Sequence, residues 1–172
     1  MYNFRLLTFD VEINWFSMKI LMVCLGNICR SPIAEGILRS KAQEKQLAIT
    51  VDSAGTIGIH AGEQPDKRMQ ATALNFGIDI SPLKSRQVRL SDFEEFDRIY
   101  AMDESNYNDL VQLAKQDAHI QKIKLIIEEN PKQTIKNVPD PYYGGQDGFN
   151  QVYHLLDDAI EHLVKKLEHE SR

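Results

Sequence analysis

The stretch CLGNICRSP (24–32) contains both cysteines of the chain and places an arginine directly after the second. Five residues separate Cys24 from Arg30, and a loop of this length can curl until successive backbone N–H groups point inward and bind an anion. Arg30 adds a planar, permanently charged guanidinium that can bind two oxygens of a phosphate group. The same positive field favours the nucleophilic thiolate form of Cys24. The stretch therefore predicts a phosphate-binding loop in which a phosphoryl group is transferred to the sulfur of Cys24. The alternative is that the spacing is accidental and that the cysteine is inert and only fills space in the core.

Phosphoryl transfer from an alcohol or phenol also needs a proton donor for the leaving oxygen, and hydrolysis of the thiophosphate needs a proton acceptor for water. Asp140, in the segment VPDPYYGG, is the best candidate, because prolines on both sides stiffen its loop. Tyr142 and Tyr143 offer aromatic walls beside it. The alternative is that Asp140 and Pro141 only start a turn. A Walker-type nucleotide loop is excluded, since the chain has no G-x4-G-K-[ST] run.

The loop must be held between a strand and a helix. The apolar run 19–24 predicts a strand buried on both faces, and Ser31 followed by Pro32 predicts the N-cap and the first residue of a helix. One face of that helix carries apolar residues at helical spacing: Ile33, Ala34, Ile37, Leu38 and Ala42. Gly26 and Asn27 tolerate the positive φ of a tight loop. The N-terminus of the helix would then point at the same anion.

Further strands are predicted at 48–56, 97–103 and 123–129, each followed by a helix or loop. The segment 152–167 is an amphipathic helix, with its apolar stripe formed by Val152, Leu155, Leu156, Ala159, Ile160, Leu163 and Leu167. Strands that alternate with helices predict a parallel sheet with helices on both faces and right-handed crossovers. In such folds ligands bind beyond the carboxyl ends of the strands, where the loop after the first strand lies.

Composition restricts the class of protein. The 172 residues fit one globular domain, and a net charge of −5 with a pI near 5.5 argues against nonspecific binding to nucleic acid or to an anionic membrane. Two cysteines this close together cannot cross-link a fold of this size by a disulfide. We find neither a secretory segment nor an apolar run of the roughly 18 residues that span a bilayer, so a cytoplasmic setting is expected. Because Met18 directly precedes the first strand, we expect the functional domain at 18–172. Residues 1–17 are then an extension of unknown role, either a mis-called start or a surface tail.

Four segments together carry a resemblance. VCLGNICRSP, VDSAGT, AMDESN and DPYYGG occur in this order, and the chain from Met18 to about Leu167 resembles the low-molecular-weight protein tyrosine phosphatase family. The resemblance implies a single three-layer αβα domain with a four-stranded parallel sheet in the order 2-1-3-4. It also implies hydrolysis of phosphotyrosine or another aryl phosphate with no cofactor and no metal, and the chain has no Cys/His cluster suited to a metal.

The resemblance also implies roles for individual residues. Cys24 is the nucleophile that forms a cysteinyl-phosphate, Arg30 binds phosphate and stabilises the transition state, and Asp140 is the general acid and then the base. The whole phosphate-binding loop is Cys24, Leu25, Gly26, Asn27, Ile28, Cys29, Arg30 and Ser31. The implied substrates are tyrosine-phosphorylated proteins, with a bacterial-type tyrosine kinase as one candidate partner and no role for nucleic acid or membrane.

Other residues are implied to support this chemistry. Ser31 donates a hydrogen bond to the thiolate, and Asn27 holds the strained loop in contact with Ser53. The mouth of the pocket is lined by Leu25, Ile59, Tyr142 and Tyr143. Cys29 pairs with the nucleophile on oxidation, so that inactivation by peroxide is reversible. Asp103 is expected to cap a helix rather than to join a charge network.

Three alternatives remain open. A protein-arginine phosphatase of the same fold would carry threonine where Ile28 presents only methyl groups, which favours an aryl substrate. An arsenate reductase of the thioredoxin-coupled kind would need a further cysteine outside the loop. A non-catalytic phosphotyrosine-binding module would be expected to lack Cys24, Arg30 or Asp140. Many family members carry an aromatic residue at the position of Ile59, so stacking on a substrate ring is expected to be weaker here.

Overall fold

The computed structural model describes residues 17–142 and 145–170. Apart from Ser17, the expected N-terminal extension therefore lies outside the described residues, and so does Tyr143.

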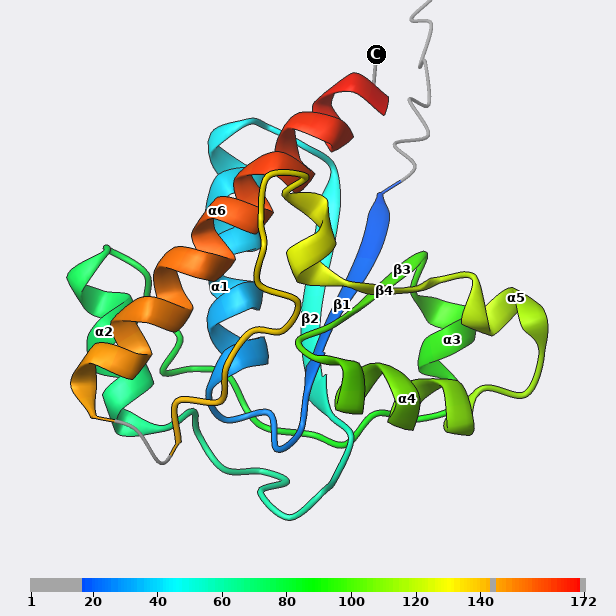
Figure 1. Ribbon diagram of the computed structural model, residues 1–172, viewed down its shortest axis with the longest axis horizontal. Coiled ribbons are helices and arrows are strands. Elements are labelled where there is room, and N and C mark those ends of the chain that lie inside the picture. Colours follow the sequence, from blue (N-terminus) through cyan, green and yellow to red (C-terminus); the bar gives the residue numbers. More distant parts are fainter. Residues whose placement is uncertain (1–16, 143–144, 171–172) are drawn as a thin grey trace, which may run out of the picture.

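The centre of the fold is a four-stranded parallel sheet (Figure 1). Strand β1 (Met18–Cys24) pairs with β2 (Ile49–Gly55) on one side and with β3 (Arg98–Ala101) on the other. The short strand β4 (Ile123–Leu125) pairs with β3. The order β2-β1-β3-β4 confirms the expected topology and places β1 inside the sheet, where both of its faces are covered.

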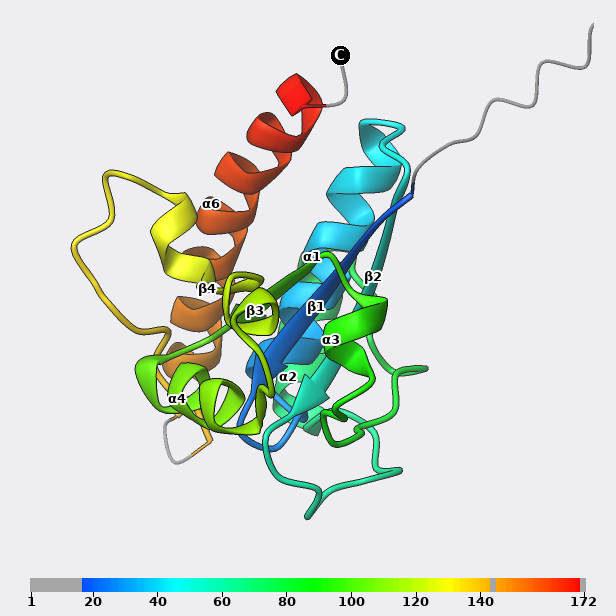
Figure 2. The same ribbon diagram turned by 90° about the vertical axis from the view of Figure 1, so that its right-hand side faces the viewer.

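Helices cover both faces of the sheet (Figures 1 and 2). On one face lie α1 (Arg30–Glu44), α2 (Lys67–Asn75) and α6 (Gln146–Glu170). On the other lie α3 (Asp92–Glu95), α4 (Glu104–Leu113) and the short α5 (Asp117–Ile120), which the sequence analysis did not predict. This arrangement confirms the three-layer αβα architecture.

The two layers of helices bury separate apolar cores. Side chains alternate along β1, so Ile20, Met22 and Cys24 face the core against α1 and α6, while Leu21 and Val23 face the other core. This double burial explains why the strand is an unbroken apolar run rather than an alternating one. It also places Cys24 on the α1 side, at the carboxyl end of a rigid strand.

The start of α1 differs from the prediction. The helix begins at Arg30, with Cys29 at the capping position and no side-chain cap, so the prediction that Ser31 is the N-cap is wrong. The Ser31 hydroxyl is instead hydrogen-bonded within the loop, at 3.0 Å from the Cys24 sulfur. Pro32 is the third helical residue and is tolerated there, because N–H groups of a first turn have no partner within the helix.

Two other elements are shorter than predicted. The segment 123–129 was expected to be a strand throughout, but after Leu125 it turns into a 3₁₀ helix, η1 (Ile126–Glu129). Ile126 and Ile127 are buried in the core that contains α6, so their apolar character reflects packing rather than strand pairing. The strand predicted at 97–103 ends at Ala101, because Asp103 caps α4.

Helix α6 follows the prediction more closely. Of its predicted stripe, Leu155 is only partly buried, and the other members are buried against the core. Within residues 17–142 and 145–170, we find no helix with both the length and the apolar character needed to cross a bilayer.

Candidate active site

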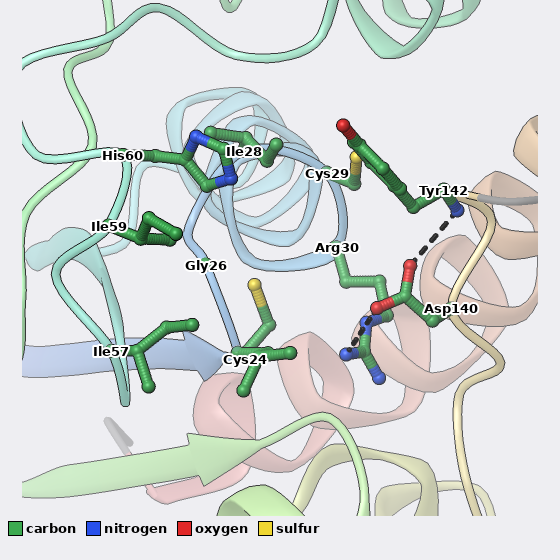
Figure 3. Close-up of a pocket in the computed structure, with 11 residues that line it drawn as sticks. Cys24, Gly26, Ile28, Cys29, Arg30, Ile57, Ile59, His60, Asp140 and Tyr142 are labelled. Atoms are coloured by element: carbon green, nitrogen blue, oxygen red, sulfur yellow. Dashed lines mark hydrogen bonds and ion pairs between the residues drawn. The ribbon is translucent and has the colours of Figure 1, made fainter.

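The loop between β1 and α1 opens into a pocket of about 350 Å³ at the carboxyl edge of the sheet (Figure 3). Its lining comes from this loop, from the segment after β2 and from the segment before α6. The lining residues are Cys24, Leu25, Gly26, Ile28, Cys29, Arg30, Ile57, Ile59, His60, Asp140 and Tyr142. The structure thus places the predicted Cys24, Arg30 and Asp140 around a single cavity, together with three of the four predicted mouth residues.

Asn27 determines the shape of the loop. Its φ is +55°, in the left-handed region that non-glycine residues rarely adopt. Its amide nitrogen donates to the hydroxyls of Ser31 and Ser53, each at 2.9 Å, and its amide oxygen accepts from the backbone N–H of Arg86, also at 2.9 Å. These bonds join the loop to α1, to β2 and to the segment before β3.

Gly26 has a different role from the one predicted. The sequence analysis expected Gly26 and Asn27 to accommodate the positive φ of the loop; Asn27 does so, whereas the φ of Gly26 is not positive. A Cβ atom at this position would lie 3.0 Å from the ring of His60. The glycine therefore allows the loop and the segment after β2 to approach each other closely across the pocket.

The sulfur of Cys24 faces two polar groups. The backbone N–H of Asn27 donates to it at 3.3 Å, and the Ser31 hydroxyl lies 3.0 Å away. Ser31 already accepts from the Asn27 amide, so its own proton can go to the sulfur or to the carbonyl of Ala54 at 3.3 Å. A thiolate can only accept hydrogen bonds. In a thiolate state of Cys24 the Ser31 hydroxyl would therefore be the donor, and Cys24 itself is only 3% exposed.

A buried acid lies behind the loop. The Ser53 hydroxyl donates to Glu35 on α1 at 2.6 Å, and Glu35 also forms an ion pair with Arg39. Burial raises the pKa of Glu35. The sequence analysis missed this residue, although a glutamate among Ile33, Ala34, Ile37 and Leu38 on an apolar helix face was a usable signal.

Arg30 is buried among acidic groups. Its side chain is 4% exposed, and it donates to Asp103, to the carbonyl of Val138 at 3.1 Å and to Asp140 at 3.1 Å. Burial lowers the pKa of Arg30, but the nearby Cys24, Asp103 and Asp140 outweigh it and raise the pKa above its usual value. The guanidinium therefore remains charged inside the protein.

Asp103 has a second role that the sequence analysis did not expect. It caps α4 as predicted, by accepting from the backbone N–H of Asn106 at 2.7 Å. The prediction that it takes no part in a charge network is wrong, because its other carboxylate oxygen binds Arg30. The two residues are 73 positions apart in the chain, so no local pattern revealed the pair.

Asp140 and Tyr142 form one side of the mouth, opposite Ile57, Ile59 and His60 (Figure 3). The Asp140 carboxylate is 42% exposed and accepts from Arg30 and from the backbone N–H of Tyr142 at 3.0 Å. Across the pocket, Ile59 is 73% exposed. The His60 ring is hydrogen-bonded to Glu63 at 2.8 Å. Ile57 and His60 were not predicted as pocket residues.

The comparison with known families identifies the chain. Residues 19–172 match the family profile described as low molecular weight phosphotyrosine protein phosphatase. The chain belongs to this family. It is a protein tyrosine phosphatase. In the described part of the chain, we find no group of three His, Cys, Asp or Glu side chains arranged to hold a metal ion.

Individual relatives agree with this assignment. A Synechocystis protein, provisionally named a low molecular weight protein-tyrosine-phosphatase, is 43% identical over 152 residues, which are 87% of this chain and 96% of the relative. The crystal structure of a protein tyrosine phosphatase from Entamoeba histolytica superposes with a TM-score of 0.85 at 42% identity, covering 91% of this chain and all of that one. Vibrio vulnificus Wzb, solved in complex with benzylphosphonate, has a TM-score of 0.78 at 29% identity, over 87% of this chain and 98% of that one.

The amide of Asn27 leads to a stability prediction for this phosphatase. Asn27→Ala leaves buried polar groups without partners and puts alanine in the left-handed region, so we expect the free energy of unfolding to fall by about 3 kcal/mol. Asn27→Gly removes the backbone strain but not the unpaired groups, and should lose roughly 1 kcal/mol less. Urea unfolding with unchanged m-values measures both.

Gln46 provides the control, because it has a φ of +53° but is exposed at the end of α1. Gln46→Ala should change the stability by less than about 1 kcal/mol. A loss in Asn27→Ala no larger than that in Gln46→Ala would contradict the role of the amide bonds.

Proposed function

We propose that this phosphatase hydrolyses phosphotyrosine through a covalent cysteinyl-phosphate, with Cys24 as nucleophile, Arg30 as phosphate ligand and Asp140 as general acid and base. The proposal is supported above all by the meeting of these three side chains at one pocket, although Asp140 lies 110 positions after Arg30. A thiolate, a fixed guanidinium and a carboxyl group are the groups that phosphoryl transfer to sulfur requires.

In the first step, the Cys24 sulfur attacks phosphorus, so that an S–P bond forms while the bond from phosphorus to the tyrosine oxygen breaks. Protonated Asp140 gives its proton to the leaving oxygen, and tyrosine departs as a neutral phenol. The loop N–H groups, the N-terminus of α1 and Arg30 bind the phosphoryl oxygens, whose charge must be stabilised in the transition state.

In the second step, water attacks the phosphorus of the cysteinyl-phosphate. Asp140, now ionised, accepts a proton from that water as the S–P bond breaks, and inorganic phosphate is released. Cys24 leaves as a thiolate, and the donors at its sulfur, Ser31 and the N–H of Asn27, stabilise this anion. The same donors thus favour the nucleophile before attack and the leaving group afterwards.

The pocket walls favour an aryl phosphate. The lining around the sulfur is largely apolar and includes the side chains of Leu25, Ile28, Ile57, Ile59 and Tyr142. An apolar wall can bury a phenyl ring, whereas a phosphoguanidinium would leave its N–H groups unpaired against the methyl groups of Ile28. The benzylphosphonate bound by the Vibrio relative, a phosphonate attached to a benzyl group, has the same combination of anion and ring. Because Ile59 is aliphatic, it packs against a ring without aromatic stacking.

Tyrosine-phosphorylated proteins are the proposed substrates. We include a bacterial-type tyrosine kinase as a candidate partner in a cytoplasmic setting, by analogy with the family alone. Cys29 is proposed as a redox guard. Burial raises the pKa of its thiol above the ordinary value, which favours the protonated form of Cys29, a weaker nucleophile than a thiolate.

A panel of phosphopeptides tests the substrate class. We expect phosphate release from a phosphotyrosine peptide, and none above background from phosphoserine or phosphoarginine peptides of the same sequence. Cys24→Ser should lower the rate by at least roughly 1,000-fold, because serine is a far weaker nucleophile at neutral pH. A phosphoarginine rate that matches the phosphotyrosine rate would favour the arginine phosphatase, and full turnover by Cys24→Ser would exclude the covalent mechanism.

The acid role of Asp140 predicts a dependence on the leaving group. Asp140→Asn should lower kcat/KM by roughly 100-fold or more for aryl phosphates whose phenols are weak acids, and much less for those whose phenols ionise readily. The measurement is kcat/KM against the pKa of the leaving phenol. Asp79→Asn is the matched control, since the Asp79 carboxylate bonds locally to the backbone of Ser81. If Asp140→Asn leaves the slope unchanged, another group is the acid.

The redox proposal has its own test. Peroxide converts the Cys24 thiolate to a sulfenic acid, and the Cys29 thiol then attacks that sulfur, releasing water and forming a disulfide. We expect dithiothreitol to restore activity in wild type but only partially in Cys29→Ala, where Cys24 oxidises further. Mass spectrometry should detect loss of two hydrogens in the wild type. Equal recovery of both proteins would remove Cys29 from this role.

A further inference from the structure

Arg68, in the first turn of α2, forms a bidentate pair with Asp66. Its Nε donates to one carboxylate oxygen of Asp66 at 3.0 Å and one terminal nitrogen donates to the other at 2.7 Å. Asp66 is also the N-cap of α2 and accepts from the backbone N–H of Arg68 at 2.8 Å. The hydrogen bond from the Arg68 side chain lowers the pKa of Asp66, so the pair stays ionised and fixes the plane of the guanidinium.

This pair is attached to the phosphate-binding loop. The backbone N–H of Asp66 donates to the carbonyl of Ile28 at 2.8 Å. Ile28 lies in the middle of the loop, between Asn27 and Cys29. The position of the guanidinium is therefore set relative to the loop that surrounds the Cys24 sulfur.

The remaining terminal nitrogen of Arg68 reaches the segment that carries the proposed acid. It donates to the carbonyl of Tyr142 at 3.1 Å, and the central guanidinium carbon lies 5.4 Å from the centre of the Tyr142 ring. The same carbon lies 4.7 Å from the ring centre of Phe149, which is buried in the first turn of α6. Arg68 thus contacts both the loop at Tyr142, through a backbone hydrogen bond and the ring, and the start of α6, through the ring of Phe149.

The contact continues to Asp140 itself. The backbone N–H of Tyr142 donates to the Asp140 carboxylate at 3.0 Å (Figure 3), so Arg68 holds the residue whose N–H orients the acid. The other Asp140 oxygen accepts from Arg30, which in the proposed reaction must also bind phosphate. An acid that shares its partner with the substrate needs a second, independent support, because displacement by about 1 Å can cost roughly 100-fold in rate.

We propose that Arg68 is a positioning residue that holds the Tyr142 backbone, and through it the Asp140 carboxyl, at a set distance from the phosphate-binding loop. The inference rests on the proposed role of Asp140 as general acid. Lysine could replace arginine here only in part, because a single ammonium cannot bind both oxygens of Asp66 in a fork and also reach the Tyr142 carbonyl in the same plane.

The test is the leaving-group series applied to Arg68→Met. We expect kcat/KM to fall roughly 10- to 100-fold for phenols that are weak acids and to change less than about threefold for phenols that ionise readily. Arg68→Lys should fall between wild type and Arg68→Met. Arg89→Met, the same substitution at an exposed arginine, should match wild type. Thermal unfolding checks each variant, and Arg68→Lys carries the test if Arg68→Met does not fold.

A double mutant separates positioning from other roles. If Arg68 acts through Asp140, Arg68→Met should have no further effect on the leaving-group slope in an Asp140→Asn background. Equal losses for all leaving groups, a raised KM for phosphotyrosine peptides with an unchanged slope, or a full additional loss in the double mutant would each overturn the inference. Failure of the proposed function gives a different result: Asp140→Asn alone would leave the leaving-group slope unchanged. In that case both the acid role of Asp140 and the positioning role of Arg68 would be wrong.

Discussion

The shape of the site depends on the amide of Asn27, a buried left-handed residue in the loop between β1 and α1. At a buried non-glycine residue, left-handed backbone is held in place by the surrounding contacts. Here the amide is bonded to Ser31, Ser53 and the backbone of Arg86, which belong to three different segments. Ser31 belongs to α1 and Ser53 to β2, and the carbonyl of Arg86 accepts from the backbone N–H of Gly55 at the end of β2, so the Asn27 amide ties the loop to the sheet and to a helix.

The second constraint is the buried guanidinium of Arg30, which needs acidic partners because an unpaired buried charge is costly. Its two partners differ in freedom. Asp103 is tied to the start of α4 by its capping bond, whereas Asp140 stands at the partly open mouth of the pocket. In the proposed reaction this difference is useful, since Asp103 can keep Arg30 in place while Asp140 exchanges a proton.

The parts of the fold that were predictable are those determined by neighbouring residues. The strand 19–24, the loop after it and the amphipathic stripe of α6 follow from local apolar patterns. The errors have physical causes. Ser31 is a good cap by type, but the sulfur of Cys24 and the amide of Asn27 compete for its hydroxyl. The apolar residues after Leu125 resemble a strand in sequence, but they form a 3₁₀ helix whose isoleucines are buried in the core. The pairs Arg30–Asp103 and Arg68–Tyr142 join distant segments, which no local pattern reveals.

The difference between local and distant contacts also separates the binding of phosphate from the donation of a proton. An anion site can be built from one continuous stretch, because a loop and the helix after it supply both the N–H groups and the charge. A proton donor must approach from the opposite side of the phosphorus and so has to come from another part of the chain. Its placement then depends on contacts that bridge the two segments, and the structure provides them twice, at Arg30 and at Arg68. In the proposed mechanism, loss of the Arg68 contact should therefore impair proton transfer more than phosphate binding, whereas Arg30 serves both functions.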